Sequence, residues 1–148
     1  MVYQREIATE VGLQAGVDRV WDILTDFKQY RQWNTFLLEM KGRAEVGSKV
    51  CFVFELPRGF RFPACARVLD VKPSTALRWA GGIRGVFRAE HYFLLESVSA
   101  TETRLHHGEI FTGVLVPLVW KLVLAWRGPP VYERMNQALK QRAEQQPQ

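Results

Sequence analysis

The segment from residue 105 to residue 126 constrains the fold more than any other part of this chain. Residues 105–113 alternate apolar and polar side chains like a strand. The next thirteen residues, 114–126, carry a single charge, on Lys121. A strand with isolated polar residues that runs directly into an apolar helix predicts a sheet wrapped around that helix, with a few polar groups pointing into an internal cavity. The face shared by alternate residues of this strand consists of Leu105, His107, Glu109 and Phe111.

Length and composition predict one domain, 1–148, with about residues 3–144 ordered and a frayed tail. A chain of 148 residues buries about two-thirds of the surface that its unfolded form exposes. The first residues lack the apolar region of a signal peptide, and the longest apolar run is shorter than the roughly 18 residues of a membrane span. We therefore expect a cytoplasmic protein without stable membrane insertion.

The formal charge of +5 does not predict a nucleic-acid partner. The 20 Lys and Arg residues are spread along the chain and interleaved with 15 acidic residues, without the run of like charge that marks an interaction tail. Cys51 and Cys65 form no CxxC motif, so we expect no zinc site. Two buried thiols are the expectation for a reducing cytosol, and the sequence leaves their redox state open.

The first quarter of the chain predicts one strand and two short helices. Residues 3–13 alternate loosely and indicate a strand. Apolar residues then recur at helical spacing over 18–25, and 27–33 predicts a second helical segment that ends at Asn34.

From residue 36 to residue 111 the alternation predicts about six consecutive antiparallel strands joined by short turns, for six to seven in all. A strand ending near Leu56 pairs with 62–71, and a short strand at Leu77 and Trp79 ends at the Gly81–Gly82 pair. If the last hairpin turns around Ala100, residues whose numbers add up to 200 lie opposite each other. If the earlier hairpin turns around Arg58, residues whose numbers add up to 116 lie opposite each other, as Cys51 and Cys65 do.

The C-terminal part predicts a long helix with an irregularity. Residues 117–126 are apolar around most of the helix circumference, which favours burial against the sheet over docking on a membrane. Gly128, Pro129 and Pro130 kink or interrupt the helix, because proline lacks a backbone donor and clashes with the preceding turn. The helix resumes to about Ala143. The predicted fold class is α+β: a curved antiparallel sheet around a long C-terminal helix.

Six short motifs then suggest a family. In chain order they are 20–27 (VWDILTDF), 33–34 (WN), 77–79 (LRW), 90–93 (EHYF), 109–113 (EIFTG) and 135–140 (MNQALK). Over about residues 5–144 the chain resembles the polyketide cyclase/dehydrase-like proteins of the START-like (SRPBCC), helix-grip superfamily, which also contains the plant Bet v 1 allergens. The resemblance implies a hydrophobic cavity between the sheet and the C-terminal helix. Members of the superfamily bind lipids, sterols, hormones or polyketides, and a minority catalyse cyclisation or dehydration.

The candidate site centres on His91 and Glu109. Their positions sum to 200, which places them opposite each other with Cβ atoms about 5 Å apart. A carboxylate can orient an imidazole, so the pair could anchor a ligand or act as a general acid and base. His107 is a second candidate. The expected ligand-binding residues are Trp33, Phe54, Trp79, His91, Phe93, His107, Glu109, Phe111 and Trp120, and Trp126 is expected to line the same cavity.

The expected function is binding of a small hydrophobic or amphipathic ligand, such as a lipid, an aromatic compound or a polyketide-like molecule. The alternative is a cyclase or dehydratase in which His91 is the base and Glu109 orients it. A third class is a protein-interaction module. In the turn at 57–61, Arg58 and Arg61 could steer an anionic ligand. No cofactor or metal is expected, and the sequence leaves the oligomeric state open.

Overall fold

The computed structural model describes residues 2–145, so the predicted tail at 146–148 lies outside the described residues. The elements, in chain order, are β1 (Tyr3–Leu13), α1 (Val17–Thr25), η1 (Phe27–Gln29), α2 (Tyr30–Trp33), β2 (Leu37–Lys41), β3 (Lys49–Glu55), η2 (Pro57–Gly59), β4 (Arg61–Lys72), β5 (Ala76–Ile83), β6 (Phe87–Ser99), β7 (Glu102–Gly113), α3 (Val116–Arg127) and α4 (Pro129–Glu144).

Over residues 2–145 the strands form one seven-stranded antiparallel sheet in the order β1-β7-β6-β5-β4-β3-β2. The predicted registers are confirmed: His91 lies opposite Glu109, and Cys51 lies opposite Cys65. One boundary was wrong, because β5 continues through Gly81 and Gly82 to Ile83. Gly82 has a φ of +96°, which a glycine adopts without the strain of a side chain and which lets the strand bend and continue.

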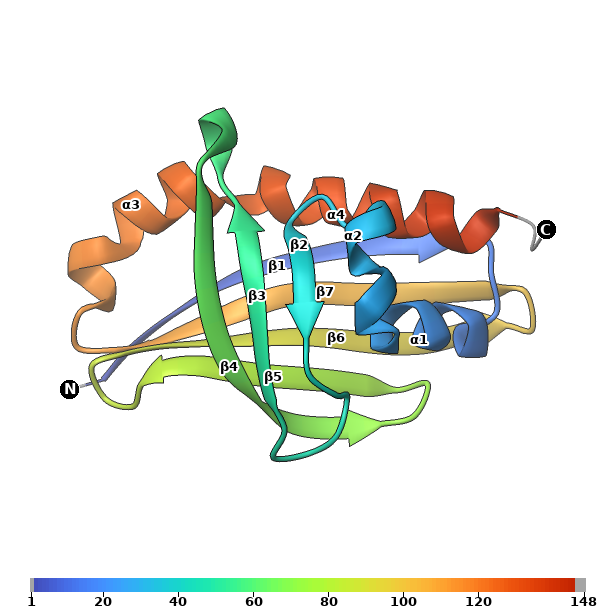
Figure 1. The fold of residues 1–148 in the computed structure, drawn as a ribbon, viewed down its shortest axis with the longest axis horizontal. Helices are drawn as coiled ribbons and strands as arrows, with labels where there is room; N and C mark the ends of the chain where they lie inside the picture. The colour runs from blue at the N-terminus through green and yellow to red at the C-terminus, as the bar shows by residue number, and fades with distance from the viewer. Residues whose placement is uncertain (1, 146–148) are drawn as a thin grey trace.

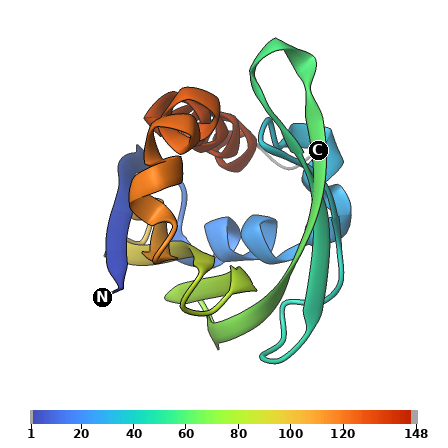
Figure 2. The same cartoon turned by 90° about the vertical axis from the view of Figure 1, so that its left-hand side faces the viewer.

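The sheet curves around the space beneath the C-terminal helices, so the α+β helix-grip prediction is confirmed (Figures 1 and 2). Helix α4 packs most closely on β1 and buries Val131, Met135 and Leu139 at helical spacing. Helix α1 meets the far end of α4, where the Arg19 Nε donates a hydrogen bond to the backbone oxygen of Ala143 at 2.8 Å.

The C-terminal helix is interrupted rather than kinked. Gly128 is extended, with φ −73° and ψ 179°, and α4 begins with Pro129 and Pro130 in its first turn. Prolines suit a first turn because the missing N–H groups would have no partner there. Helix α3 is therefore a separate element that runs at an angle to α4 (Figure 1).

The predicted burial of the apolar segment 114–126 is wrong. Val116 is fully buried, but Leu118 is 80% exposed and Leu122 is 59% exposed. The interruption at Gly128 lets only one face of α3 pack on the sheet, so apolar side chains on the other face contact solvent. No helix within residues 2–145 is long and apolar enough to cross a membrane.

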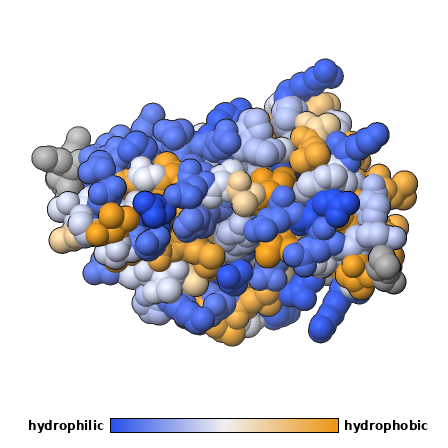
Figure 3. All heavy atoms as spheres, turned by 180° about the vertical axis from the view of Figure 1, so that it is seen from behind, coloured by the Kyte–Doolittle hydropathy of each residue, from blue (hydrophilic) through white to orange (hydrophobic). Residues whose placement is uncertain are grey.

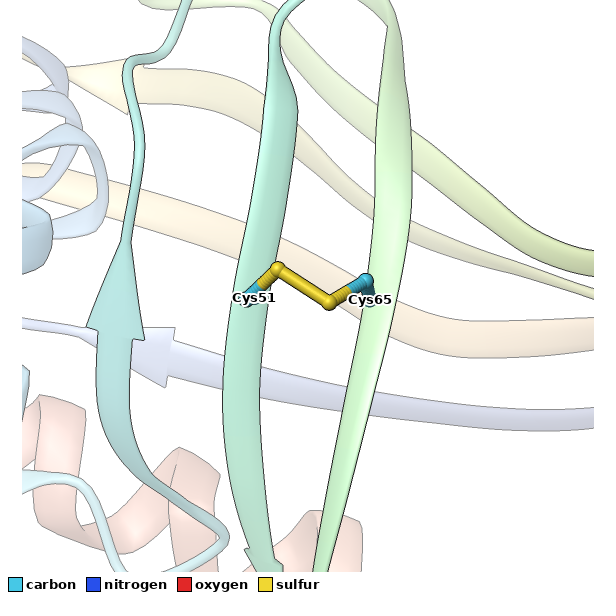
Figure 4. Close-up of a disulfide and its surroundings, with 2 residues drawn as sticks. All are labelled: Cys51 and Cys65. Carbon is cyan, nitrogen blue, oxygen red and sulfur yellow. A yellow bond between two sulfur atoms is a disulfide. The ribbon is translucent and has the colours of Figure 1, made fainter.

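The expectation of two free thiols is also wrong, because Cys51 and Cys65 form a disulfide between β3 and β4 (Figure 4). Their register position brings the two Cα atoms to 4.1 Å. The bond lies about midway along the hairpin whose inner face lines the cavity described next.

Candidate functional site

A cavity of about 200 Å³ lies between the sheet and the end of α3. Four strands, β3 to β6, supply its apolar wall, and one residue each from β7 and α3 supplies charge. Its lining residues are Phe52, Phe54, Ala64, Cys65, Ala66, Trp79, Gly81, Gly82, Phe87, Ala89, Glu109 and Arg127. Apolar walls with a few converging polar groups are typical of small-molecule sites.

The alternation of the strands explains why the cavity exists. Inner positions of β4, β5 and β6 carry small residues, including Ala64, Gly81 and Ala89, and therefore leave space above the sheet. The aromatic rings of Phe54 and Trp79 bound that space. Phe54 stacks on Phe36 with a centroid distance of 5.5 Å, which holds one wall in place.

Glu109 and Arg127 form the charged end of the cavity. Arg127 Nη2 donates a hydrogen bond to Glu109 Oε2, and the Tyr132 hydroxyl donates to the same oxygen. The guanidinium carbon of Arg127 also lies 4.4 Å from the centroid of the Phe54 ring, a cation–π contact. The last residue of α3 and the first turns of α4 therefore hold this carboxylate from above the sheet.

The protonation states follow from these contacts. Burial alone would raise the pKa of Glu109, but the charge of Arg127, with contributions from His91 and Tyr132, holds that pKa well below its usual range. Burial and the neighbouring carboxylate raise the pKa of Tyr132 well above its ordinary value. The site thus holds a carboxylate anion, a guanidinium cation and a neutral phenol. A carboxylate with so low a pKa is a weak general base.

A second buried network lies beside the first, and its hydrogen-bond directions can be assigned throughout. The Thr9 hydroxyl donates to the backbone oxygen of His107 at 2.6 Å, so it must accept the 2.8 Å hydrogen bond from the Asn136 amide nitrogen. The amide oxygen of Asn136 then faces His107 Nδ1 at 2.7 Å. It follows that His107 Nδ1 carries a hydrogen.

The donor and the acceptor of the hydrogen bond between His107 and His91 can be assigned in the same way. Burial, followed by the charge of His91, lowers the pKa of His107 well below its ordinary value, so His107 is neutral and its Nε2 is an acceptor. His91 Nε2 lies 2.7 Å from that atom and therefore donates to it. Of the four nitrogens of the two rings, only Nδ1 of His91 makes no hydrogen bond within residues 2–145. It lies 3.8 Å from Glu109 Oε1, which is longer than a hydrogen bond.

The structure divides the predicted ligand-binding residues into groups. Three of them line the cavity: Phe54, Trp79 and Glu109. Four are packed in the core directly behind it: His91, Phe93, His107 and Phe111. His91 is 1% exposed and stacks on Trp79 with a centroid distance of 5.1 Å, so the indole lies beside it at the cavity wall.

The remaining predicted tryptophans lie elsewhere. Trp120 packs edge-on against Phe111 at 5.7 Å between ring centroids. Trp33 lines a separate hollow of about 320 Å³ between α1 and the end of α4. Trp126, which was expected in the cavity wall, is exposed and contacts Phe60 at 5.8 Å between centroids.

Sequence patterns missed Arg127, Tyr132, Asn136 and Thr9. One usable signal was the position of Arg127, a single charge at the end of an apolar run and directly before the helix break at Gly128. The other three are single polar residues on the inward faces of a strand or a helix, and no sequence pattern shows that they contact one another. Within residues 2–145 no three His, Cys, Asp or Glu side chains are arranged to hold a metal ion.

Comparisons with known proteins agree with this architecture. By structure, the chain is similar to a START superfamily protein from Mycobacterium smegmatis, with 20% identity, a TM-score of 0.73, and coverage of 94% of this chain and 97% of that one. It is also similar to truncated norcoclaurine synthase from Thalictrum flavum, with 13% identity, a TM-score of 0.71, and coverage of 99% and 97%.

The di-domain ARO/CYC StfQ from the steffimycin biosynthetic pathway matches at 9% identity with a TM-score of 0.74, over 95% of this chain and 51% of that one. These identities establish the fold alone. In sequence, no curated protein matches the chain. The family model described as polyketide cyclase/dehydrase and lipid transport matches residues 4–144. The chain therefore belongs to the polyketide cyclase/dehydrase and lipid transport family.

Proposed function

We propose that this protein binds a small hydrophobic or amphipathic molecule in the cavity between the sheet and the C-terminal helices. The observation that carries this proposal is an apolar cavity whose lining includes a buried ion pair, Glu109 with Arg127. The walls supply nonspecific affinity, and the charged end fixes the orientation of the ligand. Family membership is consistent with this function.

The polar end favours a ligand with an acceptor oxygen. The Nε–H of Arg127 is buried and has no hydrogen-bond partner among the described residues. Such a group costs free energy until an acceptor reaches it. A carbonyl, carboxylate or hydroxyl oxygen of the ligand would satisfy it. The cavity is smaller than the roughly 300–1,000 Å³ of ordinary ligand pockets, so it suits a compact molecule or the inner part of a longer one.

The second candidate is an enzyme of the cyclase or dehydratase kind, acting on an aromatic or polyketide-like substrate. The observation that favours it is the histidine network, which leaves Nδ1 of His91 free beside Glu109. Two features favour binding instead: His91 does not line the cavity, and the pKa of Glu109 is too low for an effective base. An enzyme would need Trp79 to move before a substrate reached His91.

Native mass spectrometry of the purified protein, followed by denaturing extraction, tests the binding proposal. We expect a co-purifying small molecule, or a ligand found in a screen of lipids and aromatic compounds. Ala64→Leu should fill part of the cavity and reduce retention of that ligand, whereas Val53→Leu, on the outer face of the neighbouring strand, should not. An apo mass together with no ligand in the screen would contradict the proposal.

The two candidates differ in their response to His91→Gln. An enzyme that uses His91 should lose its bell-shaped pH–rate profile while the fold is retained. A binding protein should show only a change in affinity. Activity measured on the extracted molecule, or on a close analogue, decides between them.

A further inference from the structure

The end of the molecule that carries α3 has an unusual surface (Figure 3). Three segments form this surface: α3 with the residues before it (114–126), the turn between β5 and β6 (83–86), and the tip of the β3–β4 hairpin (57–62). Figure 2 views the molecule from this end. We call these three segments the rim.

Direct contacts join the three segments. The backbone N–H groups of Val114 and Leu115 donate to the backbone oxygens of Gly85 and Val86, each at 3.0 Å. On the other side, the Trp126 ring contacts Phe60 at the hairpin tip. The strands that lead into the turn and the tip line the cavity, as does Arg127 at the end of α3. The rim is therefore one continuous surface next to the cavity.

The rim exposes many large apolar side chains. Figure 3 shows apolar atoms on the surface at the end of the molecule that carries α3, on the right of that view. The exposed large apolar residues of the rim are Phe60, Phe62, Ile83, Val86, Val114, Leu115, Leu118, Leu122, Leu124 and Trp126. Contiguous apolar patches of this kind on a globular domain mark interaction sites.

The exposed apolar side chains of helix α3 lie on one face of the helix. Val116, Val119, Trp120 and Val123 face inward, as their burial or partial burial shows. Leu115, Leu118, Leu122 and Trp126 recur at helical spacing on the opposite face and are exposed. An outward apolar stripe on a helix that already packs its inner face implies a second apolar partner.

The charges of the rim indicate the chemistry of that partner. Its three segments contain four basic residues, Arg58, Arg61, Arg84 and Lys121, and no Asp or Glu. All four basic residues are exposed. Long basic side chains can extend beside an apolar surface and place their charges at a polar boundary. Apolar side chains ringed by basic ones are complementary to a bilayer with anionic headgroups.

We propose that the rim docks on the surface of an anionic lipid bilayer, with Leu118 and Leu122 inserted among the lipids and the four basic residues at the headgroups. The inference goes beyond ligand binding and does not depend on what the cavity holds. It brings the cavity close to the bilayer, so that a hydrophobic ligand could be taken up from the lipids.

A second copy of this chain fits the rim less well. A two-fold dimer through this surface would bring the same four basic residues of two molecules together. Like charges at an apolar contact oppose association, and no acidic residue of the rim compensates them.

Vesicle flotation of the full chain tests the proposal. The probes are phosphatidylcholine vesicles with and without about one-third phosphatidylglycerol. We expect flotation with the anionic vesicles, weakened by salt because surface charges are screened. The double variant Leu118→Asp and Leu122→Asp should reduce bound protein by about tenfold or more, because two inserted side chains become charged. Lys121→Glu should weaken binding to anionic vesicles.

Val46→Asp is the matched control. Val46 is 66% exposed and lies in the loop between β2 and β3, at the opposite end of the β3–β4 hairpin from the rim, so flotation should not change. Circular dichroism verifies that each variant is folded. Absence of flotation, equal binding to both vesicle types, or unchanged binding of the double variant would overturn the proposal, and a dimer in sedimentation equilibrium that the double variant abolishes would assign the rim to a second copy.

Failure here is distinguishable from failure of the ligand-binding proposal. Ala64→Leu reduces the cavity and should leave flotation unchanged, whereas the rim variants should leave retention of a bound ligand in native mass spectra unchanged.

Discussion

The buried His107 should make the stability of this protein fall with pH well before the carboxylates titrate. His107 is 0% exposed, and burial, followed by the charge of His91, lowers its pKa well below the ordinary value. The unfolded chain binds a proton at a pKa of about 6.5, whereas the folded chain keeps this ring neutral. The unfolded state therefore holds more protons below neutral pH, and stability must fall as pH falls.

The magnitude follows from that one proton. For a ring that stays neutral in the folded state, the free energy of unfolding decreases by about 1.4 kcal/mol for each pH unit well below the unfolded pKa. Between pH 7 and pH 5 the loss from His107 amounts to about 2 kcal/mol. For a chain of this size, that corresponds to a decrease in Tm of about 6 °C.

The assay is urea unfolding at several pH values between 7 and 5, compared for wild type, His107→Gln and His106→Gln. Glutamine at 107 can still donate to Asn136 and accept from His91, but it does not titrate. We expect His107→Gln to lose about 2 kcal/mol of the pH dependence and His106→Gln, at a half-buried neighbouring position, to retain most of it. If the pH dependence of His107→Gln matched that of wild type, the assignment of a neutral His107 would be refuted.

Three further predictions concern stability. Glu109→Gln and Arg127→Met should each lower the free energy of unfolding by about 3–5 kcal/mol, because each leaves a buried partner unpaired. In urea unfolding, the double variant should lose much less than the sum of the two single losses. Additive losses would contradict the ion-pair argument. Reduction of the Cys51–Cys65 bond, which closes a loop with a sequence separation of 14, should cost about 3 kcal/mol, measured as the difference in thermal unfolding with and without reductant; an unchanged Tm would contradict it. Gly108→Ala should cost at least about 1–3 kcal/mol, because its methyl group would overlap a backbone oxygen of β1, and a wild-type urea midpoint would refute this.

The sequence predicted the sheet well because the faces of the strands and the hairpin registers depend on residues that are close together in the chain. Alternation along a strand assigns each side chain to a face, and a short turn fixes the hairpin register. The pairing of His91 with Glu109 followed from these two facts and was confirmed. The same argument placed Cys51 opposite Cys65, although it could not show that the thiols are bonded.

The hydrogen-bond partners within the site could not be predicted in the same way. Cross-strand register gives Cβ proximity, yet His91 turns its Nε2 to His107 while Glu109 bonds Arg127 and Tyr132. Those two partners come from the C-terminal helices, whose placement over the sheet depends on long-range packing. The aromatic residues illustrate the same limit, because a buried ring such as Phe93 and a cavity-lining ring such as Trp79 have the same sequence pattern.

By itself the sequence determined the order of the strands along the chain, the faces of the strands, an irregularity of the helix near Gly128 and the family resemblance, since all of these depend on periodicity and on neighbouring residues. Only the tertiary structure decided which partners neutralise Glu109, which residues line the cavity, and that α3 exposes an apolar face. These features depend on how helices sit on a curved sheet. The sequence of α3 is apolar on all sides and therefore predicts a fully buried helix. The break at Gly128 separates α3 from α4, and one face of α3 stays at the surface.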